Sequence, residues 1–137
     1  MTVETSIETF FAAQWGATTT IVYPNTETSQ MTPVDKEITA SIFVLPIDVV
    51  DLGVPIRPGT ARRERYILQI NLSSPNKVGA GQLNTHIQTL NGIFRNETCV
   101  LADSNTYYFG QPIRRSPFTS DTAYIVPWEC EFTVYYN

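Results

Sequence analysis

The sequence predicts an α+β domain, with a mainly antiparallel sheet and two amphipathic helices packed on one face. Two stretches, residues 3–15 and 83–94, show helical spacing of apolar side chains. Three longer stretches, residues 38–44, 62–72 and 124–136, alternate apolar and polar side chains as half-buried strands do. Because the strands do not alternate regularly with the helices, an antiparallel sheet is favoured. The length fits a single domain, residues 1–137.

Each predicted helix has one apolar face. In the first, Gly16 supplies a C-terminal stop after five apolar positions that share a face: Val3, Ile7, Phe10, Phe11 and Trp15. The second follows a loop predicted over residues 73–81, and its apolar positions are Leu83, Ile87, Leu90 and Phe94.

The strands are predicted from alternation and from the residues that bound them. A short strand covers residues 20–23, and the strand of residues 38–44 ends at Pro46. In residues 62–72, Tyr66 and Leu68 are expected to point inward and Arg65 outward. Short strands are predicted at 99–101 and 107–109, and a long one at 124–136, where Pro127 indicates an edge position or a bulge. Residues 25–33 and 47–61 are predicted loops.

Composition and charge disfavour several classes of function. The net charge of −4 and the low isoelectric point, near 4.8, argue against a dedicated nucleic-acid binder. Neither a basic leader followed by an apolar run nor a membrane-length apolar stretch is visible, so we expect a soluble protein made in the cytoplasm. Cys99 and Cys130 lack metal-site or redox spacing and are expected to be free thiols. The aromatic content of 12% points weakly to a contact surface.

The sequence offers no convincing catalytic centre. His86 is the sole histidine, and it lies one position off the apolar stripe of the second helix without a nearby nucleophile. A dyad with Cys99 is a weaker alternative, and Asp48 and Asp51 lack metal-ligand spacing. The turn at residues 79–81 matches no phosphate-binding pattern. We therefore expect no enzyme activity, no cofactor and no metal.

Charged residues at matching spacing suggest a contact. Glu129 and Glu131 should project from one face of the last strand, and Arg63 and Arg65 have the same two-residue spacing on another strand. We expect these four residues to meet, either within the subunit or across a subunit boundary, and they are the candidate interface residues.

Two basic spots, Arg62 with its neighbours and Arg114 with Arg115, are candidates for contact with DNA or an acidic partner. A solvated or salt-bridged surface is the alternative for both spots.

The central stretch resembles the tail-terminator and related minor tail proteins of long-tailed bacteriophages. The likeness lies in residues 59–72 (GTARRERYILQINL), in residues 74–79 (SPNKVG) and in the following helix with Leu83, Leu90 and Phe94. In that family, a strand leads through a Pro- and Gly-containing loop into an amphipathic helix that ends with Phe. The order from an N-terminal helix to a long final strand is also similar, so the likeness covers most of the chain.

The resemblance implies a homohexameric ring that caps the finished tail tube, ends its elongation and joins it to the head-side connector. The expected partners are further copies of the chain, the tail tube protein and the connector, with genomic DNA passing through the lumen and no membrane. The expected location is the head-proximal end of the tail in the virion, and the host cytoplasm during assembly. A ring requires complementary surfaces on two sides of each subunit.

Two alternatives remain open. A neck or head-completion protein would share the size, the acidity and the lack of catalytic groups. A small ligand-binding α+β domain would instead close its sheet around a pocket lined by residues such as Tyr66, Trp128 and Phe132.

Overall fold

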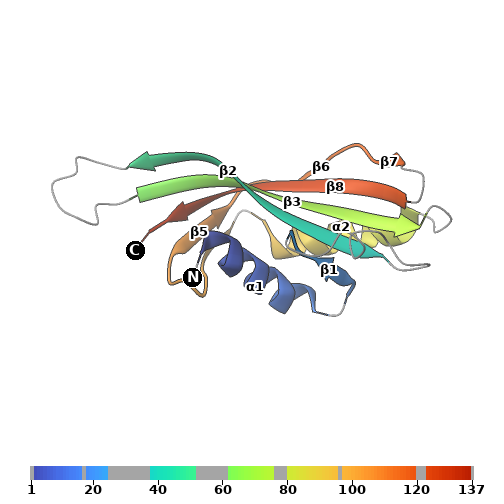
Figure 1. Ribbon diagram of the computed structural model, residues 1–137, viewed down its shortest axis with the longest axis horizontal. Coiled ribbons are helices and arrows are strands. Elements are labelled where there is room, and N and C mark those ends of the chain that lie inside the picture. The colour runs from blue at the N-terminus through green and yellow to red at the C-terminus, as the bar shows by residue number, and fades with distance from the viewer. Residues whose placement is uncertain are drawn as a thin grey trace.

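The computed structural model describes residues 2–16, 18–24, 38–51, 62–75, 80–95, 97–119 and 123–136. It confirms the α+β class: two helices lie on one face of a curled, mostly antiparallel sheet (Figure 1). In chain order the elements are α1 (Val3–Trp15), β1 (Thr20–Val22), β2 (Thr39–Asp51), β3 (Arg62–Pro75), α2 (Ala80–Ile93), β4 (Glu97–Val100), β5 (Thr106–Phe109), β6 (Ile113–Arg114), β7 (Phe118–Thr119) and β8 (Ala123–Tyr135).

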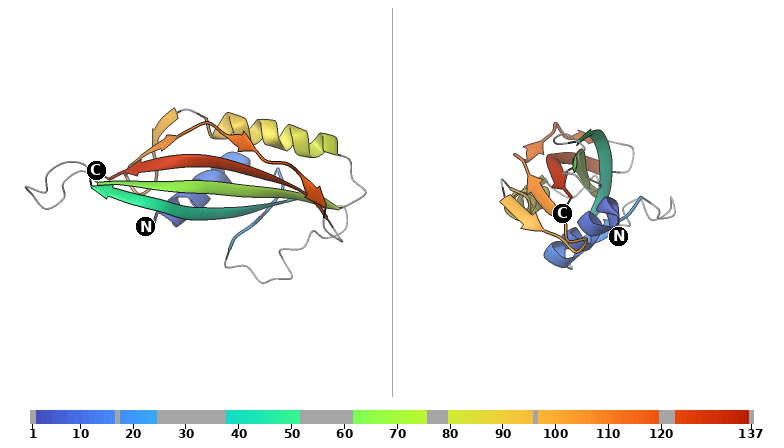
Figure 2. Two further views of the ribbon diagram at one scale, coloured as in Figure 1. Left: turned by 90° about the horizontal axis from the view of Figure 1, so that it is seen from above. Right: turned by 90° about the vertical axis from the view of Figure 1, so that its left-hand side faces the viewer.

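Three long strands form the centre of the sheet. The strand order is β1-β2-β3-β8-β5-β4, with β6 and β7 also paired to β8. Among the described strands only β1 and β2 pair in parallel, and the other pairs are antiparallel. Strands β2, β3 and β8 run side by side along the length of the molecule (Figure 2). Strand β8, the last in sequence, is therefore central in space.

Helix α1 begins and ends as its sequence predicts. The Thr2 side chain caps the helix by accepting a hydrogen bond from the backbone N–H of Thr5 at 3.1 Å. Gly16 ends it with a φ of 61°, in the left-handed region that favours glycine, and donates its N–H to the Ala12 carbonyl at 3.0 Å. The predicted apolar face is buried except for Phe10, which is half-buried against Phe94 and Phe109.

Aromatic rings fill the core between the helices and the sheet. Phe94, one residue beyond α2, is fully buried and contacts four other rings: Phe10, Phe11, Phe109 and Trp128. The α2 positions predicted to face inward, Leu83, Ile87 and Leu90, are buried around it. The helical stripes and the inward face of β3 therefore meet as the sequence predicts, with Leu68, Ile70 and Leu72 fully buried.

The predicted end of the strand at Pro46 is wrong, because β2 continues to Asp51. A register shift between Pro46 and Asp48 makes Ile47 the extra residue of a bulge, after which pairing with β3 resumes. Residues 47–51 of the predicted 47–61 loop are thus strand, and residues 52–61 lie outside the described residues, as does the predicted 25–33 loop. Similarly, β3 runs to Pro75, beyond the predicted loop start at residue 73.

Two further register irregularities occur where residues 109–118 pair with the other edge of β8. Phe109 pairs with Phe132, and Ile113 pairs with Glu129. The four residue steps from Phe109 to Ile113 therefore lie opposite only three steps of β8, from Phe132 to Glu129. The same offset recurs between the pairs Arg114–Trp128 and Phe118–Ile125. The extra residues fall within 110–112 and 115–117, and each segment ends with a proline, Pro112 or Pro117, that has no N–H to give to a ladder. The stretch 106–119 is thus one strand interrupted by two bulges.

Pro127, which the sequence places at an edge position or a bulge, lies in a strand that is paired on both sides. Pro127 pairs with Asn71 of β3, and its carbonyl accepts the Arg115 N–H at 2.9 Å on the opposite side of β8. The N–H and C=O of one residue point to the same side of an antiparallel strand. The missing N–H of Pro127 therefore faces Arg115, next to the place where the ladder is interrupted before Phe118. A proline is tolerated in a central strand for this reason.

One buried indole depends on a helix side chain. The Trp128 Nε1–H donates to Asn91 Oδ1 at 2.9 Å, and Trp128 is fully buried. We expect Asn91→Ala to lower the free energy of unfolding by about 1–3 kcal/mol, since it leaves a buried donor without its partner. Urea unfolding followed by tryptophan fluorescence measures the change. The matched control is Asn84→Ala, at an exposed position of α2, and an equal loss in both variants would contradict the prediction.

Candidate functional site

The candidate site lies on the outer face of the sheet, defined here as the face opposite the helices. Along β8 the side chains alternate, so that Glu129 and Glu131 lie on this face on either side of the buried Cys130. This agrees with the expected projection of both carboxylates from one face. Along β3 the outer face carries Arg63, Arg65, Ile67, Gln69 and Asn71.

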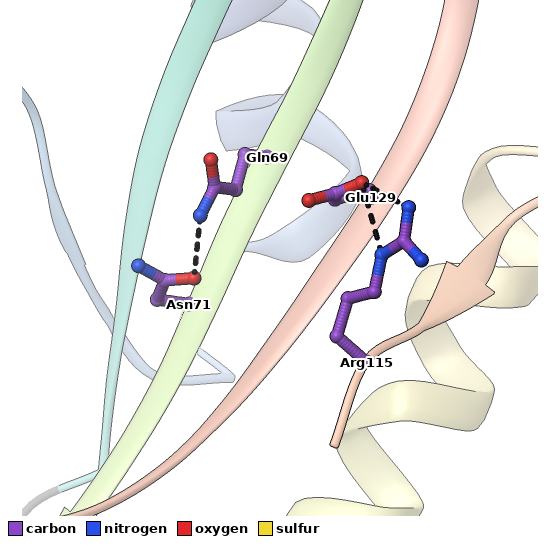
Figure 3. A network of polar contacts seen from close by, with 4 residues as sticks. All are labelled: Gln69, Asn71, Arg115 and Glu129. Carbon is purple, nitrogen blue, oxygen red and sulfur yellow. Dashed lines mark hydrogen bonds and ion pairs between the residues drawn. The ribbon is translucent and has the colours of Figure 1, made fainter. Parts of the chain in front are cut away.

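Each of the two carboxylates forms an ion pair within the subunit. Arg65 Nη2 lies 3.0 Å from Glu131 Oε1. Arg115 donates through Nε and Nη2 to Glu129 Oε2 at 3.2 and 3.1 Å (Figure 3). The strand register explains both contacts, because Arg65 lies two residues along β3 from the direct partner of Glu131, while Arg115 bonds to the backbone two residues before Glu129.

The expected meeting of four charged residues occurs only for one pair. Arg65 and Glu131 meet as predicted, within one chain. Glu129 instead pairs with Arg115, a candidate for contact with DNA or an acidic partner, and this agrees with the salt-bridged alternative for that spot. Arg63 forms no ion pair with any described residue, and its Nε is buried without a hydrogen-bond partner. Sequence spacing could not identify Arg115 as a partner because the strand that carries it was not predicted.

These ion pairs contribute little to stability. The side chains of Arg65 and Glu131 are 40% and 61% exposed, and those of Arg115 and Glu129 are 55% and 25% exposed. Exposed pairs typically contribute about 0–1 kcal/mol each. Their effect on a contact is larger, because fixed charges orient an approaching partner and exclude partners of the wrong charge pattern.

A shallow groove separates the two ion pairs. Its volume is about 330 Å³, and its apolar lining comes from Ile67 and Ile113, with Glu129, Glu131 and Arg115 at its sides. Gly110 forms one wall, and a Cβ added there would lie 3.3 Å from the Glu131 carbonyl oxygen. The groove thus combines an apolar floor with fixed charges. Beside it, the Gln69 amide donates to Asn71 Oδ1 at 3.2 Å (Figure 3).

Large apolar side chains are exposed on the same face. Leu45 lies opposite Ile67, and Ile113 lies opposite Glu129, so both share the outer face with the charged residues. Tyr108, Phe118 and Tyr135 reach it from β5, β7 and β8. Each of these five side chains, together with Ile47 and Val100, is between 37% and 65% exposed. Several large apolar side chains exposed on one face are typical of a protein contact.

The two basic spots do not merge into one surface. Arg62 begins β3, where its backbone pairs with Asp51, and Arg114 pairs with Trp128, which lies opposite Ile70. The eight residue steps along β3 from Arg62 to Ile70 span about 26 Å at about 3.3 Å per step. Arg114 and Arg115 are both exposed. The separation favours two local contacts over a continuous DNA track.

His86 lies in a packed position on α2. Its ring is half-buried, with its centroid 5.7 Å from the Trp15 ring. Cys99 is half-buried against the core and Cys130 is buried, and both are free, as expected. Burial raises the pKa of the Cys130 thiol to about 12. Among the described residues, no group of three or more His, Cys, Asp or Glu side chains could hold a metal ion.

The pKa of His86 is lowered because burial penalises its charged form. The folded state therefore binds fewer protons than the unfolded chain just below pH 6.5, so stability falls as the pH falls below this value. We expect His86→Gln to show a smaller loss of unfolding free energy between pH 7 and pH 5 than the unmodified chain. Urea titrations at both pH values measure the loss, and equal losses would contradict the assignment.

Two buried polar networks were not predicted from the sequence. Glu64, only 8% exposed, accepts hydrogen bonds through Oε2 from Tyr66 and, at 2.7 Å, from Tyr136. Asp103 accepts from the Tyr107 hydroxyl at 2.6 Å and from the Asn105 N–H at 3.0 Å. Burial raises the pKa of Asp103, but these hydrogen bonds outweigh it and hold the pKa below its usual value. Alternation along a strand predicts which side chains are buried, and it does not predict these hydrogen bonds.

The pocket residues of the ligand-binding alternative are packed into the core. Tyr66 and Phe132 stack with ring centroids 5.2 Å apart, and Trp128 contacts Phe94 at 5.6 Å. All three are less than 9% exposed. Their side chains therefore fill the space that a ligand would need.

A second groove lies on the helix side of the molecule. It has a volume of about 370 Å³ and is lined by Thr5, Glu8, Thr9, Ala12 and Tyr23. Four of these residues come from α1, which presents small and acidic side chains on its solvent side. No helix among the described residues is long and apolar enough to cross a membrane.

Comparison with known proteins supports the fold alone. Neither a family model nor a curated protein matches the sequence. A solved structure of a protein whose name states no function superposes on this chain with a TM-score of 0.66 and 16% sequence identity. The match covers 98% of this chain and 96% of the other. The chain is thus similar over nearly its whole length to a known α+β structure.

Proposed function

We propose that the chain is a non-enzymatic assembly subunit, which forms a ring that caps the tail tube of a long-tailed bacteriophage and joins it to the head connector. The observation that carries the assembly role is the outer face of the sheet. Large apolar side chains, including Leu45, Tyr108 and Phe118, are exposed there beside fixed ion pairs. An apolar surface with polar groups around it fits a protein partner better than a small ligand.

The tail-tube partner rests on the resemblance of residues 59–79 and of α2 to tail-terminator proteins. The fold is compatible with this role, since both helices lie on one side and leave the other side of the sheet for contacts (Figure 1). A neck or head-completion protein is the second candidate, favoured by the same outer face and the same acidic composition.

Mixing the purified chain with polymerising tail-tube subunits tests the role. We expect substoichiometric amounts to stop tube growth, so that electron microscopy shows shorter tubes as more of the chain is added. A triple variant of the outer face, Leu45→Ser, Ile113→Ser and Phe118→Ser, should lose this effect. The control replaces three polar residues on the solvent side of α2, Asn84, Thr85 and Gln88, with Ala. Unchanged tube lengths with the unmodified chain would refute tube capping, and binding to a head connector instead would favour the neck protein.

A further inference from the structure

One end of the outer face holds a cation, Arg63, that forms no ion pair with any described residue. Arg63 lies directly opposite Tyr135 in the β3–β8 register, and Tyr135 is 37% exposed. The Arg63 Nε is buried and makes no hydrogen bond, whereas Arg65 and Arg115 each bind a carboxylate in the same subunit. No described carboxylate neutralises this guanidinium, so a carboxylate supplied from outside would form a charge-assisted hydrogen bond with its terminal nitrogens, because the buried Nε itself is out of a partner's reach.

The solvent side of α1 holds the opposite charge. Glu4 and Glu8 lie one helical turn apart, and neither is ion-paired with a described residue. Burial, followed by repulsion from Glu4, raises the pKa of the Glu8 carboxyl. Glu8 also lines the groove of about 370 Å³, where Thr5, Thr9 and Ala12 leave space beside the helix. A cation placed here would relieve the repulsion between the two carboxylates.

We propose that these two surfaces bind each other between copies of the chain, with Arg63 pairing with Glu8 of a second copy and the Tyr135 ring entering the groove beside it. The spacing is compatible, because directly opposite strand residues have Cβ atoms about 4.5–5.5 Å apart. Arg63 and Tyr135 are such neighbours, and Glu8 borders the groove that would take the ring. Arginine and tyrosine are both enriched among the residues that contribute most to binding at the centre of protein interfaces.

The geometry favours a second copy over a different protein. The chain has only 9 Lys and Arg against 13 Asp and Glu, yet its described part contains both a guanidinium, that of Arg63, and a groove-lining carboxylate, that of Glu8, without an ion pair to a described residue. The two surfaces lie on opposite sides of the molecule, since the outer face points away from α1 (Figure 1). A contact between different surfaces is heterologous, and repeated around a closing rotation it generates a ring.

This inference rests on the proposed function and names the contact between neighbouring subunits. Sedimentation equilibrium over a concentration series tests it with the unmodified chain, Arg63→Glu, Glu8→Arg and the double variant. We expect the unmodified chain to self-associate, each single variant to associate at least about tenfold more weakly, and the double variant to recover most of the affinity. Recovery distinguishes a direct pair from general damage, because the reversed charges attract again.

Three further variants complete the experiment. Arg95→Glu, at an exposed position beyond α2, changes the net charge as Arg63→Glu does and should associate like the unmodified chain. Tyr135→Ala should weaken association, and together with Glu8→Arg it carries the test if Arg63→Glu does not fold by circular dichroism. Thr98→Ala, on the outer face of β4, should have no effect.

The outcomes separate this contact from the tail role. A chain that stays monomeric at all concentrations, or single variants that associate as well as the unmodified chain, would overturn the contact. So would a double variant as weak as the single ones. If tube growth still stops in such a case, the proposed function stands without this contact. If the charge-reversed pair restores association but tubes grow unhindered, the contact stands and the tail role is wrong.

Discussion

Phe94→Ala is expected to lower the free energy of unfolding by about 3–5 kcal/mol, the range found for deleting a buried aromatic ring. Phe94 is fully buried and lies at the centre of the aromatic core. Its ring centroid is 5.1 Å from that of Phe109 and 5.6 Å from that of Trp128. The cavity would therefore open where α1, α2 and the sheet meet, and rings packed from three sides cannot collapse into it without losing other contacts.

Guanidinium chloride unfolding measures this loss, and Phe118→Ala is the control because it removes the same side chain from a position that is 50% exposed. The control should change stability by less than about 1 kcal/mol. A similar loss in both variants would mean that the ring of Phe94 does not hold the layers together. The control variant has a second use, since Phe118 belongs to the outer face that the tube assay probes.

Glu64→Ala is expected to cost about 2–4 kcal/mol, because the buried Glu64 carboxylate accepts hydrogen bonds from both Tyr66 and Tyr136. Its removal leaves two phenol hydroxyls without this acceptor, and bonds to a charged group are stronger than neutral ones. Tyr136→Phe removes one of the two bonds and should cost less, about 1–2 kcal/mol. Glu131→Ala is the control, because Glu131 is 61% exposed and its ion pair contributes little.

The same network predicts an alkaline limit to stability. Burial raises the pKa of Tyr66, and the hydrogen bond and repulsion from Glu64 raise it further. Burial and Asp103 likewise raise the pKa of Tyr107. A group whose pKa is raised on folding contributes stability that is present below its unfolded pKa, here about 10, and lost above it. Urea titrations at pH 8 and pH 11 should therefore show lower stability at pH 11, with a smaller decrease in Tyr66→Phe. A decrease of the same size in that variant would contradict the assignment.

Both helices and the long strands could be predicted because each has one strong periodicity. The stripe from Val3 to Trp15 and the alternation from Tyr66 to Leu72 are buried as their spacing indicates. Strands β6 and β7 could not be predicted, since each is two residues long and is separated from its neighbour by a bulge at a proline. Pro46 misled in the same way, because a bulge lets β2 continue past a residue that usually ends a strand.

The sequence predicts on which face the carboxylates of the candidate site lie, but not with which arginine each of them forms an ion pair. Alternation along β8 correctly placed Glu129 and Glu131 on one face. Which arginine reaches which glutamate depends on strand order and register, and a single sequence states neither. Arg115 reaches Glu129 only because the two bulges bring residues 113–119 back onto β8. The hydrogen bonds of Glu64 could not be predicted for a related reason. Tyr66 lies on β3 whereas Tyr136 follows β8, and the Glu64 carboxylate occupies an inward position.

The position of β8 in the sheet has a consequence for synthesis on the ribosome. This strand joins β3 on one side to β5, β6 and β7 on the other, yet it is made after all of them. Until it emerges, the earlier strands lack the partner that connects them, and their apolar faces stay open to solvent. Folding of the sheet must therefore wait until residues 123–135 have left the ribosome, and contacts between residues so distant in sequence form slowly. A ribosome-stalled chain that ends before residue 123 is expected to be sensitive to protease throughout.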